Sequence, residues 1–303
     1  MQRPHGPLYM SRISVIVPHY QQENLLALCL ERLEAQTLPR SDYEVVVVEN
    51  SDGPMSSKIQ AGYPGVRFLQ ESKPGSYAAR NHGIRRTTAP ILAFTDSDCR
   101  PAPDWLERAL LLFESHPDVD LIGGNIDMFF REENRPGLIE LYDSVNYLHQ
   151  ELYVSLGFAV CANVIIKRGL FETHGLFDDT LKSGGDLEFG QRMTNAGRRI
   201  AFGVDVTVAH PARYRWNDFV TLHRRLYGGR WTINRKGTAR TIFPVNPLGI
   251  SRTVSQAWRQ VMTEKKLKTW RQRWLVFLMH QLVTLIELRE YLRLRSGMEV
   301  ERR

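Results

Sequence analysis

The stretch "YEVVVVEN", residues 43–50, decides the fold. Four consecutive valines between polar ends are typical of a parallel strand that is covered on both faces. A second β-branched run, "ISVIVPHY" (13–20), comes before it, and "NLLALCLERLEAQ" (24–36) between the two has helical apolar spacing. Strand, helix and strand in such a short length form a βαβ unit. The sequence therefore predicts a parallel sheet flanked by helices.

The same alternation continues as far as residue 96. We expect a helix at 55–63, a strand at 66–70, a helix at 76–87 and a strand at 89–96. This order is that of a doubly wound α/β sheet, whose ligands bind at the carboxyl ends of the strands. The polar residues at these ends are His19, Glu49, Asn50, Asp96 and Asp98.

The middle of the chain is less regular. Residues 104–116 form an amphipathic helical pattern, and "VDLIGGNIDMFF" (119–130) is a strand interrupted by glycines. We expect strand, turn and helix over 158–175, a helix over 184–197, and a pair of strands over 198–210 that ends on His210. There is no internal repeat and no low-complexity tract.

Charge divides the chain in two. The net charge is +7, but residues 1–210 hold 20 basic and 27 acidic residues, whereas residues 211–303 hold 20 and 6. We therefore expect a domain over 1–210 and a basic, mainly helical extension over 211–303. Such an extension suits an anionic partner, which could be a membrane surface, a phosphorylated substrate or nucleic acid.

Cysteine usage and the first residues indicate the compartment. Cys29, Cys99 and Cys161 form no C-x-x-C pair and no even disulfide framework, which favours a reducing environment. The start, "MQRPHGPLYMSR", lacks the apolar core of a signal peptide. We expect a cytoplasmic protein.

The segment 271–295 has two interpretations. Its apolar part, Trp274 to Ile286, is interrupted by polar residues and is shorter than the ~20 apolar residues that a membrane-spanning helix needs. The basic residues on both sides of this part suit a helix that lies in a membrane interface, and so do the aromatic residues Trp270 and Trp274. A terminal helix that packs on the core would show the same period.

The tripeptide Asp96-Ser97-Asp98 ends a predicted buried strand. Residues i and i+2 of a strand point the same way, so the two carboxylates could hold a hard divalent ion, Mg²⁺ or Mn²⁺. A polar turn or a cap for the following helix would use the same residues.

Six motifs, in order, resemble those of the inverting family 2 glycosyltransferases with the GT-A fold. The resemblance covers roughly residues 13–210. Its motifs are "VIVPHY", "VVVVENSDG", "KPGSYAARNHGI", "FTDSDCRPAPDWLE", "CANVIIKRGLFETHGLFD" and "SGGDLEFGQRMTNAG".

The resemblance implies a binding site for a nucleoside diphosphate-sugar, with UDP as the first expectation. Glu49 stands where the family usually has aspartate, and a solvated strand end is its alternative. Arg80 could hold diphosphate oxygens or pair with Asp52 or Glu71. The residues expected to contact the donor are Pro18, Tyr20, Glu49, Asp52, Arg80, Asn81, Asp96 and Ser97.

The resemblance also implies the catalytic groups. Asp96 and Asp98 match the metal-binding motif, and His210 matches a histidine that can be a further ligand. Asp186 matches the general base, although Gly185 replaces the acidic residue that often precedes it. The alternatives are a structural His210 and an Asp186 that caps its helix, with Glu188 and Arg192 paired outside. Cys99 is expected to be a packing residue.

Together these features predict a metal-dependent inverting glycosyltransferase. Its acceptor would be a glycan or a lipid-linked intermediate of cell-envelope or exopolysaccharide synthesis. The protein would lie peripherally at the inner face of the plasma membrane, with no nucleic acid as partner. The alternatives are a sugar nucleotidyltransferase, whose glycine-rich phosphate loop is absent from "ISVIVPHYQQE", and a non-catalytic basic module that binds membrane or nucleic acid.

Overall fold

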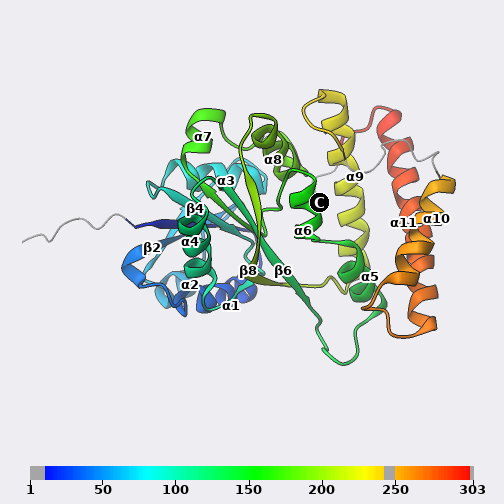
Figure 1. The fold of residues 1–303 in the computed structure, drawn as a ribbon, viewed down its shortest axis with the longest axis horizontal. Coiled ribbons are helices and arrows are strands. Elements are labelled where there is room, and N and C mark those ends of the chain that lie inside the picture. The colour runs from blue at the N-terminus through cyan, green and yellow to red at the C-terminus, as the bar shows by residue number, and fades with distance from the viewer. Residues whose placement is uncertain (1–10, 242–249, 301–303) are drawn as a thin grey trace, which may run out of the picture. The chain divides into compact units, whose positions relative to one another are not determined.

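The structure is a computed structural model that describes residues 11–241 and 250–300, with side chains in the second range from residue 254. Its centre is an eight-stranded sheet in the order β3-β2-β1-β4-β7-β6-β8-β5 (Figure 1). The strands are β1 (Ile13–His19), β2 (Tyr43–Glu49), β3 (Val66–Gln70), β4 (Ile91–Thr95), β5 (Arg100–Pro101), β6 (Leu121–Phe129), β7 (Asn163–Lys167) and β8 (Ile200–Pro211).

The described helices alternate with the first strands and dominate the second half of the chain. They are α1 (Glu23–Glu34), the 3-10 turn η1 (Arg40–Asp42), α2 (Ser57–Gly62), α3 (Ser76–Arg85), α4 (Trp105–Ser115), α5 (Leu138–Asn146), α6 (Gln150–Ser155), α7 (Gly169–His174), α8 (Gly185–Asn195), α9 (Trp216–Lys236), α10 (Ile250–Thr263) and α11 (Trp270–Arg295).

The first four strands form the parallel part of the sheet. β1 pairs in parallel with both β2 and β4, and β2 pairs in parallel with β3. Val45 to Val48 are fully or almost fully buried, because α1 and α2 cover one face and α3 covers the other (Figure 1). The predicted mostly parallel α/β fold is confirmed.

The other half of the sheet contains antiparallel pairs. β7 runs antiparallel to β4 and β6 antiparallel to β7. The predicted strand pair over 198–210 is wrong, because β8 is a single strand through Gly203. This glycine makes no turn; a Cβ there would come within 2.9 Å of Ile122, so it allows β8 to approach β6 closely.

One buried amide joins β6, β7 and β8. Asn163, at the start of β7, is fully buried. Its Nδ2 donates to the carbonyl oxygens of Asn125 (2.7 Å) and Val206 (2.8 Å), and its Oδ1 accepts from Trp105 Nε1 (2.9 Å). The amide fits because Gly124 has no side chain; a Cβ there would lie 2.4 Å from Asn163 Nδ2.

The described chain divides into two compact units. Among the described residues, the first comprises 11–127, 150–179 and 193–210, and the second comprises 128–149, 180–192, 211–241 and 250–300. The second unit therefore contains two segments that the sequence analysis assigns to the domain 1–210. The reason is packing: α5 contributes Leu141, Tyr142 and Val145 to the core that α9, α10 and α11 form.

The core of the second unit contains two histidines. Tyr142 packs edge-on against His223 (5.8 Å) and His280 (5.0 Å), as ring centroids. Burial lowers the pKa of His223 to about 3 and that of His280 to about 4. Both rings are therefore neutral near pH 7 and pack as aromatic groups.

None of the described helices combines the length and the apolar composition that a membrane span requires.

The buried amide leads to the first prediction. Asn163→Leu leaves Trp105 Nε1 and the carbonyl groups of Asn125 and Val206 without their partner, and each such group costs about 1–3 kcal/mol. We expect the free energy of unfolding to fall by at least about 3 kcal/mol, measured by urea denaturation. Asn195→Leu, the same change at an exposed helix end, is the control and should leave stability almost unchanged. Equal midpoints for the two variants would contradict the structural role of the amide.

Candidate active site

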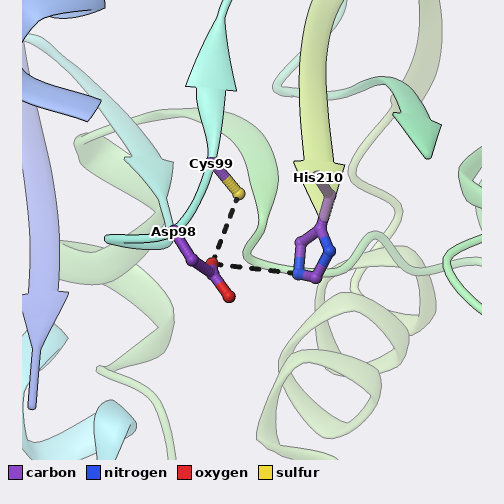
Figure 2. Close-up of side chains that lie close together, drawn as sticks. All are labelled: Asp98, Cys99 and His210. Carbon is purple, nitrogen blue, oxygen red and sulfur yellow. Dashed lines mark hydrogen bonds and ion pairs between the residues drawn. The ribbon is translucent and has the colours of Figure 1, made fainter. Parts of the chain in front are cut away.

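Strand pairing brings the aspartate motif to His210. β5 follows the motif directly and pairs antiparallel with β8, with Arg100 opposite Ala209. Asp98 and His210 therefore lie side by side in the first unit, and Asp98 Oδ1 is 3.9 Å from His210 Nε2 (Figure 2). His210 is buried, whereas the Asp98 side chain is 30% exposed. The pair is thus held in place by the buried His210 ring and open to solvent at the Asp98 carboxylate.

The donor set fits a divalent cation. A separation of 3.9 Å is too long for a hydrogen bond. It is short enough for both atoms to bind one ion, since metal–ligand bonds of roughly 2.1 Å span about 4.2 Å end to end. A carboxylate oxygen together with an imidazole nitrogen suits a hard or borderline divalent ion.

Cys99, which the sequence analysis expects to be a packing residue, lies at the same point. Its Sγ is 3.9 Å from Asp98 Oδ1, and Asp98, Cys99 and His210 form one group with metal-ligand spacing (Figure 2). Burial, and then the carboxylates of Asp98 and Asp96, raise the pKa of this thiol well above its usual value. Cys99 is fully buried, and its Sγ also lies 3.9 Å from the carbonyl oxygen of Ala162, so it packs behind the pair.

Asp96 has a different partner from Asp98. Its Oδ1 accepts a 2.5 Å hydrogen bond from Arg80 Nη2 on α3, and the Arg80 side chain is almost completely buried. Neither alternative partner expected for Arg80 is the one found: Asp52 is exposed, and Glu71 bonds to His82 at 2.9 Å. The ion pair places a guanidinium and a carboxylate at the carboxyl end of β4.

Glu49 is buried and bonded, so the expected alternative of a solvated strand end is wrong. It lies opposite His19 in the register of β1 and β2, and its Oε2 is 2.6 Å from His19 Nδ1. His19 Nε2 accepts from the backbone N–H of Gln22, so the proton must be on Nδ1, which donates to Glu49. Glu49 also accepts from Ser51 N. The Glu49 side chain, which is longer than the aspartate usual at this position in the family, thus joins the loops after β1 and β2.

The other predicted donor-site residues differ in their burial. Pro18 and Tyr20 are half-buried next to His19, and Ser97 is half-buried between the two aspartates. Asn81 is buried on α3, where its amide bonds to both the N–H and the carbonyl of Phe177. Asn81 therefore fixes the segment after α7 from inside the fold.

Asp186 belongs to the second unit. It is the second residue of α8, so it does not occupy the capping position that the alternative interpretation requires. Its Oδ1 accepts from the backbone N–H of Leu187 at 3.0 Å, and its side chain is half-buried. Glu188 and Arg192 form the expected i,i+4 pair at 2.8 Å.

The basic segment after His210 has a largely structural role. Three of its arginines form ion pairs inside the second unit: Arg213 with Asp143, Arg224 with Glu290, and Arg230 with Glu287.

The second unit also contains a cavity of about 600 Å³. Its lining residues include Lys182, Trp231, Arg235 and Lys236. Lys182 is four residues before Asp186 in the chain.

The fold and the strand-end groups agree with comparisons to known proteins. The family model "Glycosyl transferase family 2" matches residues 14–175. Glycosyltransferase AglE of Haloferax volcanii is 37% identical over 207 residues, which are 66% of this chain and 67% of that protein. A pre-mycofactocin glycosyltransferase of Mycobacterium tuberculosis is 31% identical over 233 residues, 75% of this chain but 48% of its own length.

A solved structure matches almost the whole chain. The mannosyltransferase PcManGT from Pyrobaculum calidifontis, in complex with GDP-Man and Mn²⁺, superposes with a TM-score of 0.64 at 17% identity. The match covers 97% of this chain and 89% of that one. The fold is therefore of the GT-A type, and the chain belongs to glycosyl transferase family 2. It is accordingly a transferase, and neither the nucleotidyltransferase nor the non-catalytic module describes it.

The paired donors give the second prediction. Asp98→Asn and His210→Ala should each weaken the binding of Mn²⁺ and nucleoside diphosphate by more than about tenfold. The loss of a residue that only hydrogen-bonds to a metal ligand already costs about 10–100-fold in metal affinity. Isothermal titration calorimetry with UDP, GDP and dTDP, each with and without Mn²⁺, measures this. Asp104→Asn, which removes a carboxylate from the same loop where it pairs with Arg108, is the matched control. Wild-type affinity in both site variants would contradict the assignment.

Proposed function

We propose that this protein transfers a sugar from a nucleoside diphosphate-sugar to an acceptor hydroxyl, with inversion at the anomeric carbon. The observation that carries the proposal is the 3.9 Å approach of Asp98 and His210 beside the Arg80–Asp96 ion pair. Carboxylates at the carboxyl end of a sheet repel an anionic donor unless a cation is present. Asp98 and His210 would hold Mg²⁺ or Mn²⁺, which supplies charge neutralisation for the departing diphosphate.

The nucleoside end of the donor is assigned to the loops after β1 and β2. Pro18 and Tyr20 offer a half-buried surface, and Glu49 with His19 fixes the loop that carries them. Asp52 and Ser97 offer further hydrogen-bonding groups, and Asp96 with Arg80 would face the ribose and diphosphate. UDP-sugars are the first donors to test. GDP-mannose belongs in the same screen because the structural neighbour PcManGT binds it with Mn²⁺.

Asp186 is assigned the role of general base. Its carboxylate would accept the proton of the acceptor hydroxyl as that oxygen bonds to the anomeric carbon. The bond between this carbon and the diphosphate oxygen breaks in the same step, and the electron pair leaves with the nucleoside diphosphate. A single displacement of this kind inverts the anomeric centre.

The acceptor is assigned to the cavity of the second unit. Its lining combines the cations Lys182, Arg235 and Lys236 with the flat ring of Trp231, and it also includes Glu299. Such a lining suits a sugar that carries a phosphate or carboxylate. A cell-envelope or lipid-linked glycan has this chemistry, and a peripheral position at the inner face of the plasma membrane would give access to it.

The third prediction separates donor binding from transfer. Asp186→Asn should lower kcat by about 10²–10⁴-fold, the usual contribution of a general base. The affinity for nucleoside diphosphate with Mn²⁺ should stay unchanged. Nucleoside diphosphate release from a panel of UDP-sugars and GDP-mannose, with and without acceptor extracts, provides the assay.

Asp218→Asn is the matched control for this variant. Asp218 also lies in the first turn of a helix of the second unit, but it is exposed on α9. Its removal should leave the rate unchanged. Full turnover by Asp186→Asn would show that another group takes the proton.

A further inference from the structure

Helix α11 has two apolar faces, and only one of them is used inside the fold. Val276, Met279, Val283 and Leu294 are buried against the other helices of the second unit. The opposite face carries Trp270, Trp274, Leu278, Leu285 and Leu292, which are 57%, 46%, 56%, 61% and 58% exposed. Steps of four and seven residues place these five side chains on one stripe. We call this set the outer stripe.

The outer stripe is long, and it has apolar side chains where the outward face of a helix usually has polar ones. It extends over 23 residues, with about 33 Å between its two ends at 1.5 Å per residue. The outward face of a packed helix is normally polar. Single exposed leucines need no explanation, but a row of exposed apolar side chains along one helix face marks an interaction surface.

An aromatic cluster broadens one end of the outer stripe. Trp258 of α10 lies 6.4 Å from Trp270 and 5.0 Å from Trp274, measured between ring centroids. Phe277 lies 5.2 Å from the Trp258 ring and completes the cluster. Figure 1 shows α10 and α11 side by side, so these rings belong to one surface of the second unit. Tryptophan rings favour the boundary between lipid and water, because they are apolar with one polar N–H.

The charges beside the outer stripe are basic. Arg271 follows Trp270, Arg289 is four residues after Leu285, and Arg295 is three residues after Leu292, so each neighbours the stripe on the helix surface. All three are exposed, as are Lys265, Lys266 and Lys268 before the helix. The acidic residues of α11 are not available to balance them. Glu287 pairs with Arg230, and Glu290 pairs with Arg224 and Arg293.

We propose that the outer stripe of α11, together with Trp258, docks this protein on an anionic lipid bilayer. The helix would lie in the plane of the interface, with its apolar side chains about 5–10 Å into the headgroup and acyl boundary. A second copy of the chain is the less suitable occupant, because it would bring two basic surfaces together. Since the inner face of α11 is already packed, the second unit docks as a folded body.

This docking does not depend on Asp98, His210 or Asp186. The proposal concerns where the transferase acts, and its failure would leave the proposed reaction untouched. If both hold, the acceptor is reached from the membrane surface.

The test uses the full chain and sedimentation with large unilamellar vesicles. Vesicles of phosphatidylcholine with an equal share of phosphatidylglycerol are compared with phosphatidylcholine alone at physiological salt. The wild-type protein should sediment with the anionic vesicles only. The variant Trp274→Ser/Leu278→Ser/Leu285→Ser should lose at least about tenfold in partitioning, because three apolar side chains no longer enter the interface.

Two further variants make the result specific. Leu111→Ser/Leu152→Ser/Val204→Ser removes apolar side chains of the first unit that are 50%, 53% and 63% exposed, and it should bind vesicles like wild type. Arg271→Gln/Arg289→Gln should weaken binding to anionic vesicles and make the remaining binding less sensitive to salt, because fewer charge contacts are left to screen. Thermal melting confirms that all variants are folded.

Three outcomes would overturn the proposal. The wild-type protein could fail to bind anionic vesicles, the stripe variant could bind as well as the matched control, or neutral vesicles could bind equally well. A wild-type dimer that the stripe variant converts to a monomer, without any vesicle binding, would identify a second copy as the occupant instead.

Discussion

The side-chain amide of Asn163 is the interaction on which the arrangement of the site depends. It connects β7 to the backbone of β6 and β8 while it accepts a bond from Trp105 on α4. In the sheet, Asn163 is opposite Thr95, the last residue before Asp96. Val206, which it holds, is four residues before His210. This side chain therefore helps to set the distance between the aspartate motif and the histidine, because it links β7, which pairs with β4 before the motif, to β8, which contains His210.

The parallel half of the fold could be predicted because local patterns determine it. The valine run at 45–48, the helical spacing between the strands and the polar strand ends are all visible in the sequence. The antiparallel half could not be predicted to the same extent. Gly203 resembles a turn in the sequence, but its role is close packing of β8 against β6. Asn163 stands out only as one polar residue before the apolar run "VIIK", and its partners come from three distant segments.

The site shows the same division. The sequence predicts the types of residue at the strand ends, since metal and phosphate chemistry requires them. It does not predict which side chain each carboxylate bonds to. Asp96 bonds to Arg80 and Glu49 bonds to His19; the first pair depends on the position of α3 and the second on strand register. Cys99 was expected to be a packing residue, and its place beside Asp98 and His210 was not predicted. In α11, apolar residues on two opposite faces obscure the periodicity, so the sequence alone could not separate a core helix from a surface-binding one.

The central claim is that Asp98 and His210 hold one divalent ion. Pulsed electron paramagnetic resonance of the Mn²⁺-loaded protein, with a nucleoside diphosphate present, tests this most directly. We predict modulation from one directly bound imidazole nitrogen in the wild-type protein and its loss in His210→Ala. A bound Mn²⁺ without any nitrogen coupling, or with coupling that survives in His210→Ala, would contradict the account.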